Sequence, residues 1–103
     1  MKNREVYVLK EAVADLEEGR LFYDKNKEGV GDYFYDSLIS DLEALRFFSG
    51  IHGRKFGFYR MFSKRFPFAI YYEIEKDIVY VVAVLDMRRK PSWIKRNLGK
   101  RKN

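Results

Sequence analysis

Cysteine is absent from this chain of 103 residues, which excludes disulfide bridges and thiolate metal sites. A lack of cysteine is typical of proteins from a reducing compartment. The N-terminal segment has no apolar signal core, and no apolar run approaches the ~20 residues of a membrane span. Nothing in the sequence indicates a metal or an organic cofactor. We therefore expect a small cytoplasmic protein without a membrane segment.

Charge is unevenly distributed along the chain, although its net value is +6. Residues 1–53 hold 7 Lys or Arg and 11 Asp or Glu, a net charge of −4, whereas residues 54–103 hold 14 and 4, a net charge of +10. This asymmetry predicts that the C-terminal half meets a polyanion or an acidic protein. The alternative is a solvated basic surface that keeps a small domain soluble.

Three runs rich in β-branched and aromatic residues predict strands over 56–63, 68–74 and 78–85. Because the breaks between them are short, the three strands must form an antiparallel meander. The third run is apolar almost throughout, which predicts a central strand buried on both faces. A fourth strand, over 6–9, is expected to join the same sheet.

Apolar residues recur at helical spacing in two segments after the first strand. A first helix is expected over about 11–26, with a stripe formed by Leu9, Ala12, Val13, Leu16, Gly19 and Tyr23. A second helix follows the break at 25–31, with a stripe formed by Val30, Phe34, Leu38, Leu42, Leu45 and Phe48. The short connection predicts an antiparallel helix hairpin that covers one face of the sheet. Gly19 would allow a neighbour to approach closely.

The C-terminal segment carries a helix-start signal. Pro91 at a first helical position, with Trp93 and Ile94 behind it, predicts a short helical turn that docks on the sheet. We therefore expect one α+β domain over residues 1–98, followed by a basic, disordered tail over 99–103.

Arg60 is a charge in the middle of a predicted strand, on the same face as Phe58 and Phe62. If that face lies away from the helix hairpin, Arg60 can join other cations in a concave basic surface. Alternatively, its stem packs on the two phenylalanines and its guanidinium stays in water. Arginine clusters such as 88–89 suit phosphate, because their forks match phosphate oxygens. The candidate binding set is Arg54, Lys55, Arg60, Lys64, Arg65, Arg88, Arg89, Lys90, Trp93, Lys95 and Arg96.

The order of these elements and several residues within them resemble a known family. The residues are Ala12, Asp15-Leu16, Phe34, Arg60, Arg65-Phe66-Pro67-Phe68, Ile70, Tyr72, Val81, Ala83-Val84 and Arg88-Arg89-Lys90-Pro91-Ser92-Trp93. Over about residues 6 to 97, the chain resembles the RelE/ParE superfamily of toxins from bacterial type II toxin-antitoxin (plasmid stabilisation) modules.

The resemblance implies a compact α+β toxin that inhibits growth and is neutralised by a cognate antitoxin encoded beside it. We expect the antitoxin segment to be acidic or amphipathic, because it must cover a basic half. Two activities occur in the superfamily. RelE-like members cut messenger RNA in the ribosomal decoding site, whereas ParE-like members inhibit DNA gyrase and are not nucleases.

Proton-transfer chemistry separates the two activities. RNA cleavage through the 2′-hydroxyl needs a base, an acid and cations for the phosphorane. Arg60, Arg88 and Arg89 would supply the cations, with Asp86 or His52 as the base. RelE-like ribonucleases carry a tyrosine, or a histidine and a tyrosine, near the C-terminus, and residues 90–103 contain neither. In many relatives a histidine ends the last strand, where this chain has Asp86.

We therefore favour a ParE-like toxin directed at gyrase over a RelE-like messenger RNA endoribonuclease, and so a protein that is not an enzyme. Asp86 would then pair with Arg60 or Arg88. Two further hypotheses are a non-toxic nucleic-acid-binding module and an inactive toxin. The eight tyrosines and nine phenylalanines could stack on bases, but most alternate at core spacing and are expected to fill the core.

Overall fold

The β-prone runs form a five-stranded sheet in the computed structural model, which describes residues 3–101. In order along the chain the strands are β1 (Glu5–Val8), β2 (Arg54–Lys55), β3 (Phe58–Phe62), β4 (Phe68–Glu75) and β5 (Ile78–Asp86). Their order across the sheet is β1-β5-β4-β3-β2. β1 is parallel to β5, and every other neighbouring pair is antiparallel. The predicted meander and the predicted N-terminal strand are confirmed.

β2 is an additional strand that the sequence pattern did not predict. It joins β3 through a two-residue turn, Phe56-Gly57, in which both residues have positive φ, 55° and 88°. Two positive φ angles are typical of tight hairpin turns. The sequence pattern predicted that Phe56 begins a strand. It instead occupies a left-handed turn position, which is strained for an aromatic residue. Its ring packs against the core beneath the C-terminal helix, which compensates for that strain.

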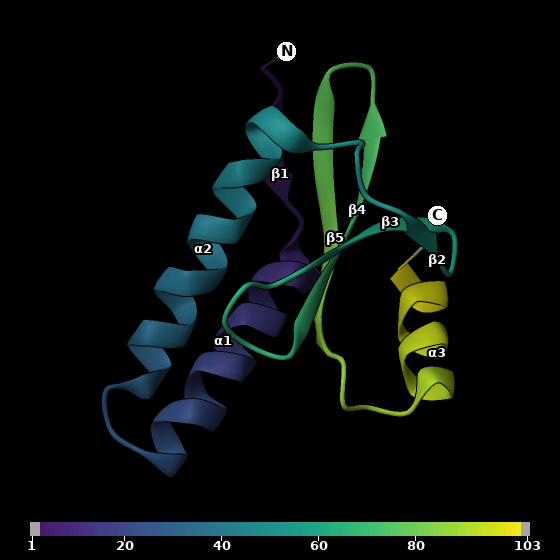
Figure 1. Ribbon diagram of the computed structural model, residues 1–103. Coiled ribbons are helices and arrows are strands. Elements are labelled where there is room, and N and C mark those ends of the chain that lie inside the picture. Colours follow the sequence, from purple (N-terminus) through teal and green to yellow (C-terminus); the bar gives the residue numbers. More distant parts are fainter. Residues whose placement is uncertain (1–2, 102–103) are drawn as a thin grey trace.

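The helices lie on opposite faces of the sheet. α1 (Lys10–Asn26) and α2 (Val30–Phe48) form the predicted hairpin on one face, and α3 (Pro91–Arg101) lies on the other (Figure 1). Leu16, Phe34 and Leu38 of the hairpin pack against Val81 and Val84 of β5. Each predicted apolar stripe included one residue that is not buried: Val13 is 48% exposed and Phe48 is 47% exposed. Val13 lies at the edge of its stripe, and Phe48 is the last residue of its helix.

The helix hairpin depends on one close contact. A Cβ atom built on Gly19 would lie 2.5 Å from Cζ of Phe34, so α1 and α2 approach closely only because residue 19 has no side chain. At the connection, the Asp24 carboxylate accepts the backbone N–H groups of Gly29 and Gly31 at 3.0 and 3.1 Å. The close approach predicted from Gly19 is confirmed.

β5 contains a bulge that its continuous apolar sequence concealed. Tyr71 pairs with Ala83 and Tyr72 pairs with Val81, so Val82 is an extra residue in β5. The bulge shifts the alternation of side chains: Val81 and Val84 face the hairpin, whereas Val82 and Ala83 both face α3. The prediction of a strand buried on both faces is confirmed.

The outer edge of β5 continues past the end of β1, which pairs only as far as Val81. There, Arg101 donates to the carbonyl oxygen of Val82 at 3.2 Å, and the Asp15 carboxylate accepts the N–H of Val84 at 2.9 Å. Asp15 and Arg101 also bind each other at 2.5 and 2.9 Å, with side chains only 10% and 15% exposed. We call this arrangement the Asp15–Arg101 clasp; it ties α1, β5 and α3 together.

The C-terminal segment differs from expectation because α3 is a full helix that extends to Arg101. The prediction of a disordered tail is therefore wrong for residues 99–101. Leu98 is buried on the sheet and Arg101 is held by Asp15, contacts that local sequence does not reveal. Residues 102 and 103 of the predicted tail lie outside the described residues. None of the described helices is long and apolar enough to cross a membrane.

Replacing Gly19 with alanine should destabilise the fold by about 1–3 kcal/mol, because the new methyl group overlaps the ring of Phe34. Gly99→Ala is the matched control: residue 99 is also helical, but a Cβ atom built there would meet nothing within 4 Å. That control should stabilise the protein by about 0.5–1 kcal/mol through helix propensity. Urea denaturation measures both, and equal effects of the two substitutions would contradict the close-packing explanation.

Arg101→Met should lower the free energy of unfolding by about 3 kcal/mol, since it leaves the Asp15 carboxylate buried without its cation. The double variant Asp15→Leu/Arg101→Met should cost clearly less than the sum of the two single changes. Arg88→Met breaks the Asp86–Arg88 ion pair, which is more exposed than the clasp, and should lower the free energy of unfolding by less than about 1 kcal/mol. Denaturation of all four variants checks this, and additive losses would show that the two clasp residues act independently.

Candidate functional site

Arg60 projects from the middle of β3 onto the α3 side of the sheet. Its neighbour Met61 faces the hairpin, and Phe58, two residues before it, is buried beneath α3. The half-buried guanidinium lies 4.7 Å from the ring centroid of Phe62. The condition for a basic surface is therefore met, because Arg60 lies on the face away from the hairpin. The Phe62 ring contacts the guanidinium itself.

Tyr71 stands directly opposite Arg60 in the β3–β4 register. Burial raises the pKa of Tyr71, and the charge and hydrogen bond of Arg60 only partly offset this increase. The Tyr71 hydroxyl is therefore protonated near neutral pH, and its oxygen accepts from Arg60. Tyr71 is only 1% exposed, so it forms the buried wall beside Arg60.

A hollow of about 220 Å³ opens beside these two residues, and we call it the Arg60 hollow. Its lining residues come from β2, the β2–β3 turn, β3, β4 and the start of α3: Lys55, Phe56, Arg60, Tyr71, Met87, Arg89, Pro91 and Ile94. It therefore contains three cations of the predicted binding set, Lys55, Arg60 and Arg89.

Aromatic rings position the three cations of the hollow. Nζ of Lys55 lies 5.0 Å from the Phe56 ring centroid, and the guanidinium of Arg89 lies 4.3 Å from that of Trp93. Within residues 3–101, none of the three cations forms an ion pair with a carboxylate. A ring restrains a cation without neutralising its charge, so this charge remains available to an anion.

Asp86 is bound to Arg88, one of the two partners expected for it. The carboxylate accepts the Nε and Nη2 groups of Arg88 at 2.9 and 2.8 Å, and also its backbone N–H at 2.9 Å. Burial raises the pKa of Asp86, but the hydrogen bonds and charge of Arg88 outweigh burial and lower it overall. Asp86 is therefore ionised at neutral pH and cannot serve as a general acid.

His52, the other candidate base, lies on the hairpin side of the sheet. Its Nδ1 is 2.5 Å from the hydroxyl of Tyr72, whose ring belongs to the hairpin-side core. Arg60 and Tyr71 face the opposite side, so the β-sheet separates His52 from them. The fold thus does not bring the five catalytic candidates together.

The predicted binding set is divided in the same way. Arg54 lies over the ring of Tyr59 on the hairpin side, opposite to its neighbour Lys55. Exposed Lys64 and Arg65 lie in the β3–β4 turn, next to Phe66, which packs against the hairpin. The remaining members, Lys90, Lys95 and Arg96, are exposed before or along α3.

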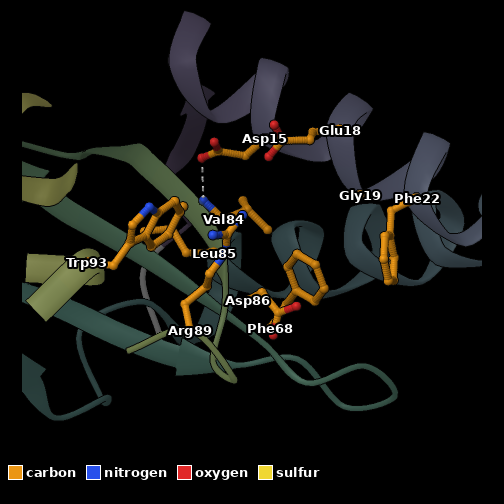
Figure 2. A pocket seen from close by; sticks show the side chains of 10 residues that line it. All are labelled: Asp15, Glu18, Gly19, Phe22, Phe68, Val84, Leu85, Asp86, Arg89 and Trp93. Carbon is orange, nitrogen blue, oxygen red and sulfur yellow. Dashed lines mark hydrogen bonds between the residues drawn. The ribbon is translucent and has the colours of Figure 1, made fainter. Parts of the chain in front are cut away.

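A second pocket, of about 330 Å³, lies between α1 and the C-terminal end of β5 (Figure 2). Asp15 and Glu18 of α1 lie across it from Trp93 and Arg89 (Figure 2). Arg89 therefore lines both this pocket and the Arg60 hollow. Asp15 is already occupied by Val84 and by Arg101, a partner 86 residues away that no local sequence signal identifies.

Comparison with protein families identifies the architecture. A family model described as "ParE toxin of type II toxin-antitoxin system, parDE" matches residues 6–91. The chain belongs to this ParE toxin family. Among solved structures, it is similar to a chain of the "Chromosomal ParDE TA system from P. aeruginosa", with a TM-score of 0.72 and 13% identity. The similarity covers 79% of this chain and 92% of the other. No curated protein sequence matches.

Membership of the ParE family confirms the RelE/ParE resemblance and the α+β fold expected from it. The matched segment ends at Pro91, so it includes the residues of β2 to β5 and ends where α3 begins. The Arg60 hollow of this ParE-family chain therefore lies mainly within the matched segment, while Trp93 and the clasp residue Arg101 lie beyond it.

The His52–Tyr72 contact makes stability depend on pH. Gly50 N–H donates to the Tyr72 oxygen at 2.9 Å, and Nδ1 of His52 lies 2.5 Å from the same oxygen; in the neutral tautomer with its proton on Nε2, His52 accepts from the hydroxyl. Burial lowers the pKa of His52 below its ordinary 6.5. A lowered folded-state pKa means that this stabilisation is complete above the unfolded pKa and is lost as pH falls from there to the folded value.

We therefore expect the free energy of unfolding to fall below about pH 6.5, with a slope of up to ~1.4 kcal/mol per pH unit from this group. In His52→Asn the side-chain oxygen can still accept from Tyr72 but does not titrate, so this component should disappear. Denaturation midpoints across the acidic range measure the difference. Parallel curves for the two proteins would contradict a pH-sensitive role for His52.

Proposed function

We propose that this ParE-family chain inhibits bacterial growth by binding DNA gyrase through the basic surface around the Arg60 hollow. The observation that carries the proposal is the engagement of Asp86 by Arg88. Messenger RNA cleavage needs a group that donates a proton to the leaving oxygen, in addition to cations. Asp86 is ionised and so cannot donate that proton, and the hydrogen bonds and charge of Arg88, which lower its pKa, also weaken it as a base; His52 lies on the other side of the sheet. Both facts support a binding toxin over a ribonuclease.

The competing function, messenger RNA cleavage, would have to use the hydroxyl of Tyr71. Tyr71 contacts Arg60 and keeps its proton near neutral pH. It is itself only 1% exposed, which restricts its contact with a leaving oxygen. We therefore rank RNA cleavage second, with Tyr71 as the residue that tests it.

We also propose that a cognate antitoxin neutralises the toxin by covering the basic surface and exposed apolar side chains of the hairpin. Leu21 and Phe22 of α1 are 55% and 51% exposed, and Phe47 and Phe48 of α2 are each 47% exposed. Large apolar side chains at the surface are typical of sites that bind a partner. An acidic, amphipathic segment would complement both features.

Induced expression in a bacterial host, with and without the product of the adjacent antitoxin gene, tests this function. We expect growth arrest that the antitoxin relieves, inhibition of supercoiling by the purified chain, and intact transcripts. Arg60→Ala should raise the concentration for half-inhibition of gyrase at least about tenfold, because a charge-assisted contact is lost. Arg54→Ala, on the other side of the sheet, should change it little.

Tyr71→Phe separates the two activities, since the substitution removes only the hydroxyl group. Gyrase inhibition does not need this proton, so growth arrest should persist in the variant. Codon-phased transcript cleavage by the native chain, lost in Tyr71→Phe, would instead establish the ribonuclease function and refute the gyrase proposal.

A further inference from the structure

The Arg60 hollow combines three properties that suit one chemical class of ligand. Lys55, Arg60 and Arg89 line it without a carboxylate partner within the described range 3–101, although other cations of this chain are neutralised. Aromatic rings hold the ammonium and guanidinium groups in place. Buried Tyr71 forms the wall of the hollow beside Arg60.

We propose that Lys55 and Arg60 bind one phosphodiester group of a nucleic-acid strand, with Arg89 as the third cationic ligand. Phosphate oxygens accept several charge-assisted hydrogen bonds at once, and the arginine fork matches their geometry. The oxygens of a phosphodiester are arranged tetrahedrally, whereas the two oxygens of a carboxylate lie in one plane, so phosphate better suits donors that come from several sides of the hollow. The inference rests on the proposed target-binding role of this same surface.

The donors come from rigid elements, which limits the cost of ordering them. Arg60 and Tyr71 face each other across two central strands, and Lys55 pairs with Phe58 in the adjoining ladder. Arg89 lines both cavities, and its guanidinium rests on Trp93 beside the neighbouring pocket (Figure 2). Rotation about its side-chain bonds would bring it from Trp93 to a phosphate in the hollow. Binding should therefore alter the environment of Trp93, the single tryptophan of the chain.

The chain supplies two matched controls, each a sequence neighbour with the same charge. Arg54 adjoins Lys55 but lies over Tyr59 on the hairpin side. Arg88 adjoins Arg89 but is neutralised by Asp86. Lys55→Gln and Arg54→Gln therefore change net charge equally, as do Arg89→Gln and Arg88→Gln. Arg54→Gln leaves the hollow unaltered, whereas Arg88→Gln also frees the Asp86 carboxylate, which interacts with Arg89, so Lys55 and Arg54 form the stricter pair.

Tryptophan fluorescence during titration with a short DNA duplex, and separately with single-stranded RNA, tests the proposal over a range of salt concentrations. We expect Lys55→Gln and Arg60→Gln to weaken binding about tenfold or more and to reduce the salt slope by about 0.9 for duplex DNA. Arg54→Gln should leave both quantities nearly unchanged, and Arg88→Gln should weaken binding less than Arg89→Gln. Arg89→Gln should also reduce the fluorescence change.

Arg60→Lys is a conservative variant that controls for misfolding, since it keeps the charge but loses the two-pronged guanidinium. Its affinity for nucleic acid should lie between those of the native chain and Arg60→Gln. If the variants of the hollow and the control variants weaken nucleic-acid binding equally, the proposal is overturned and the attraction is nonspecific. Saturable binding of polyglutamate at the same residues, with none of either nucleic acid, would also overturn it and identify an acidic protein segment as the ligand. Preference for DNA or for RNA would support it and identify the strand that supplies the phosphate.

Growth assays on the same variants separate this inference from the proposed function. If the native chain arrests growth and inhibits gyrase but Lys55→Gln retains full nucleic-acid binding, the phosphate site is refuted while the toxin function stands. If nucleic acid binds in the hollow but the chain inhibits neither growth nor gyrase, the phosphate site stands and the proposed function fails.

Discussion

The unpaired edge of β5 is the constraint on which the rest of the structure depends. β5 is nine residues long, whereas β1 is only four, so backbone groups beyond Val81 need partners from outside the sheet. Buried backbone donors and acceptors without partners cost stability. Asp15 and Arg101 satisfy Val84 and Val82, and they neutralise each other in a nearly buried site. One polar arrangement thereby fixes α1, the sheet and α3.

The position of α3 then determines the chemistry of the opposite sheet face. Because the clasp anchors the C-terminal end of α3, Ile94 and Leu98 can pack over Tyr71 and Leu85. The first turn of α3 consequently lies beside Arg60 and closes one wall of the hollow. A cation in the middle of a strand is thereby retained in a half-buried, aromatic setting, without an ionic partner among residues 3–101.

Much of the fold follows from local sequence. Alternating and helical apolar spacing identify β1, β3, β4, β5 and the hairpin, since burial of one face imposes a period on the chain. The same reasoning misses the bulge at Val82, because a strand that is apolar on both sides gives no alternation to interrupt. It also misses β2 and the turn at Phe56, where packing of the ring overrides the usual preference for glycine or asparagine.

The sequence by itself determined the family, the order of the elements and which residues carry positive charge, because these depend on composition and short-range periodicity. Only the tertiary structure decided which charges remain available. Arg88 and Arg101 are neutralised, whereas their fellow cations Arg60 and Arg89 rest on aromatic rings. Coulombic pairing depends on distances of a few ångströms, and the packing of segments far apart in the chain sets those distances.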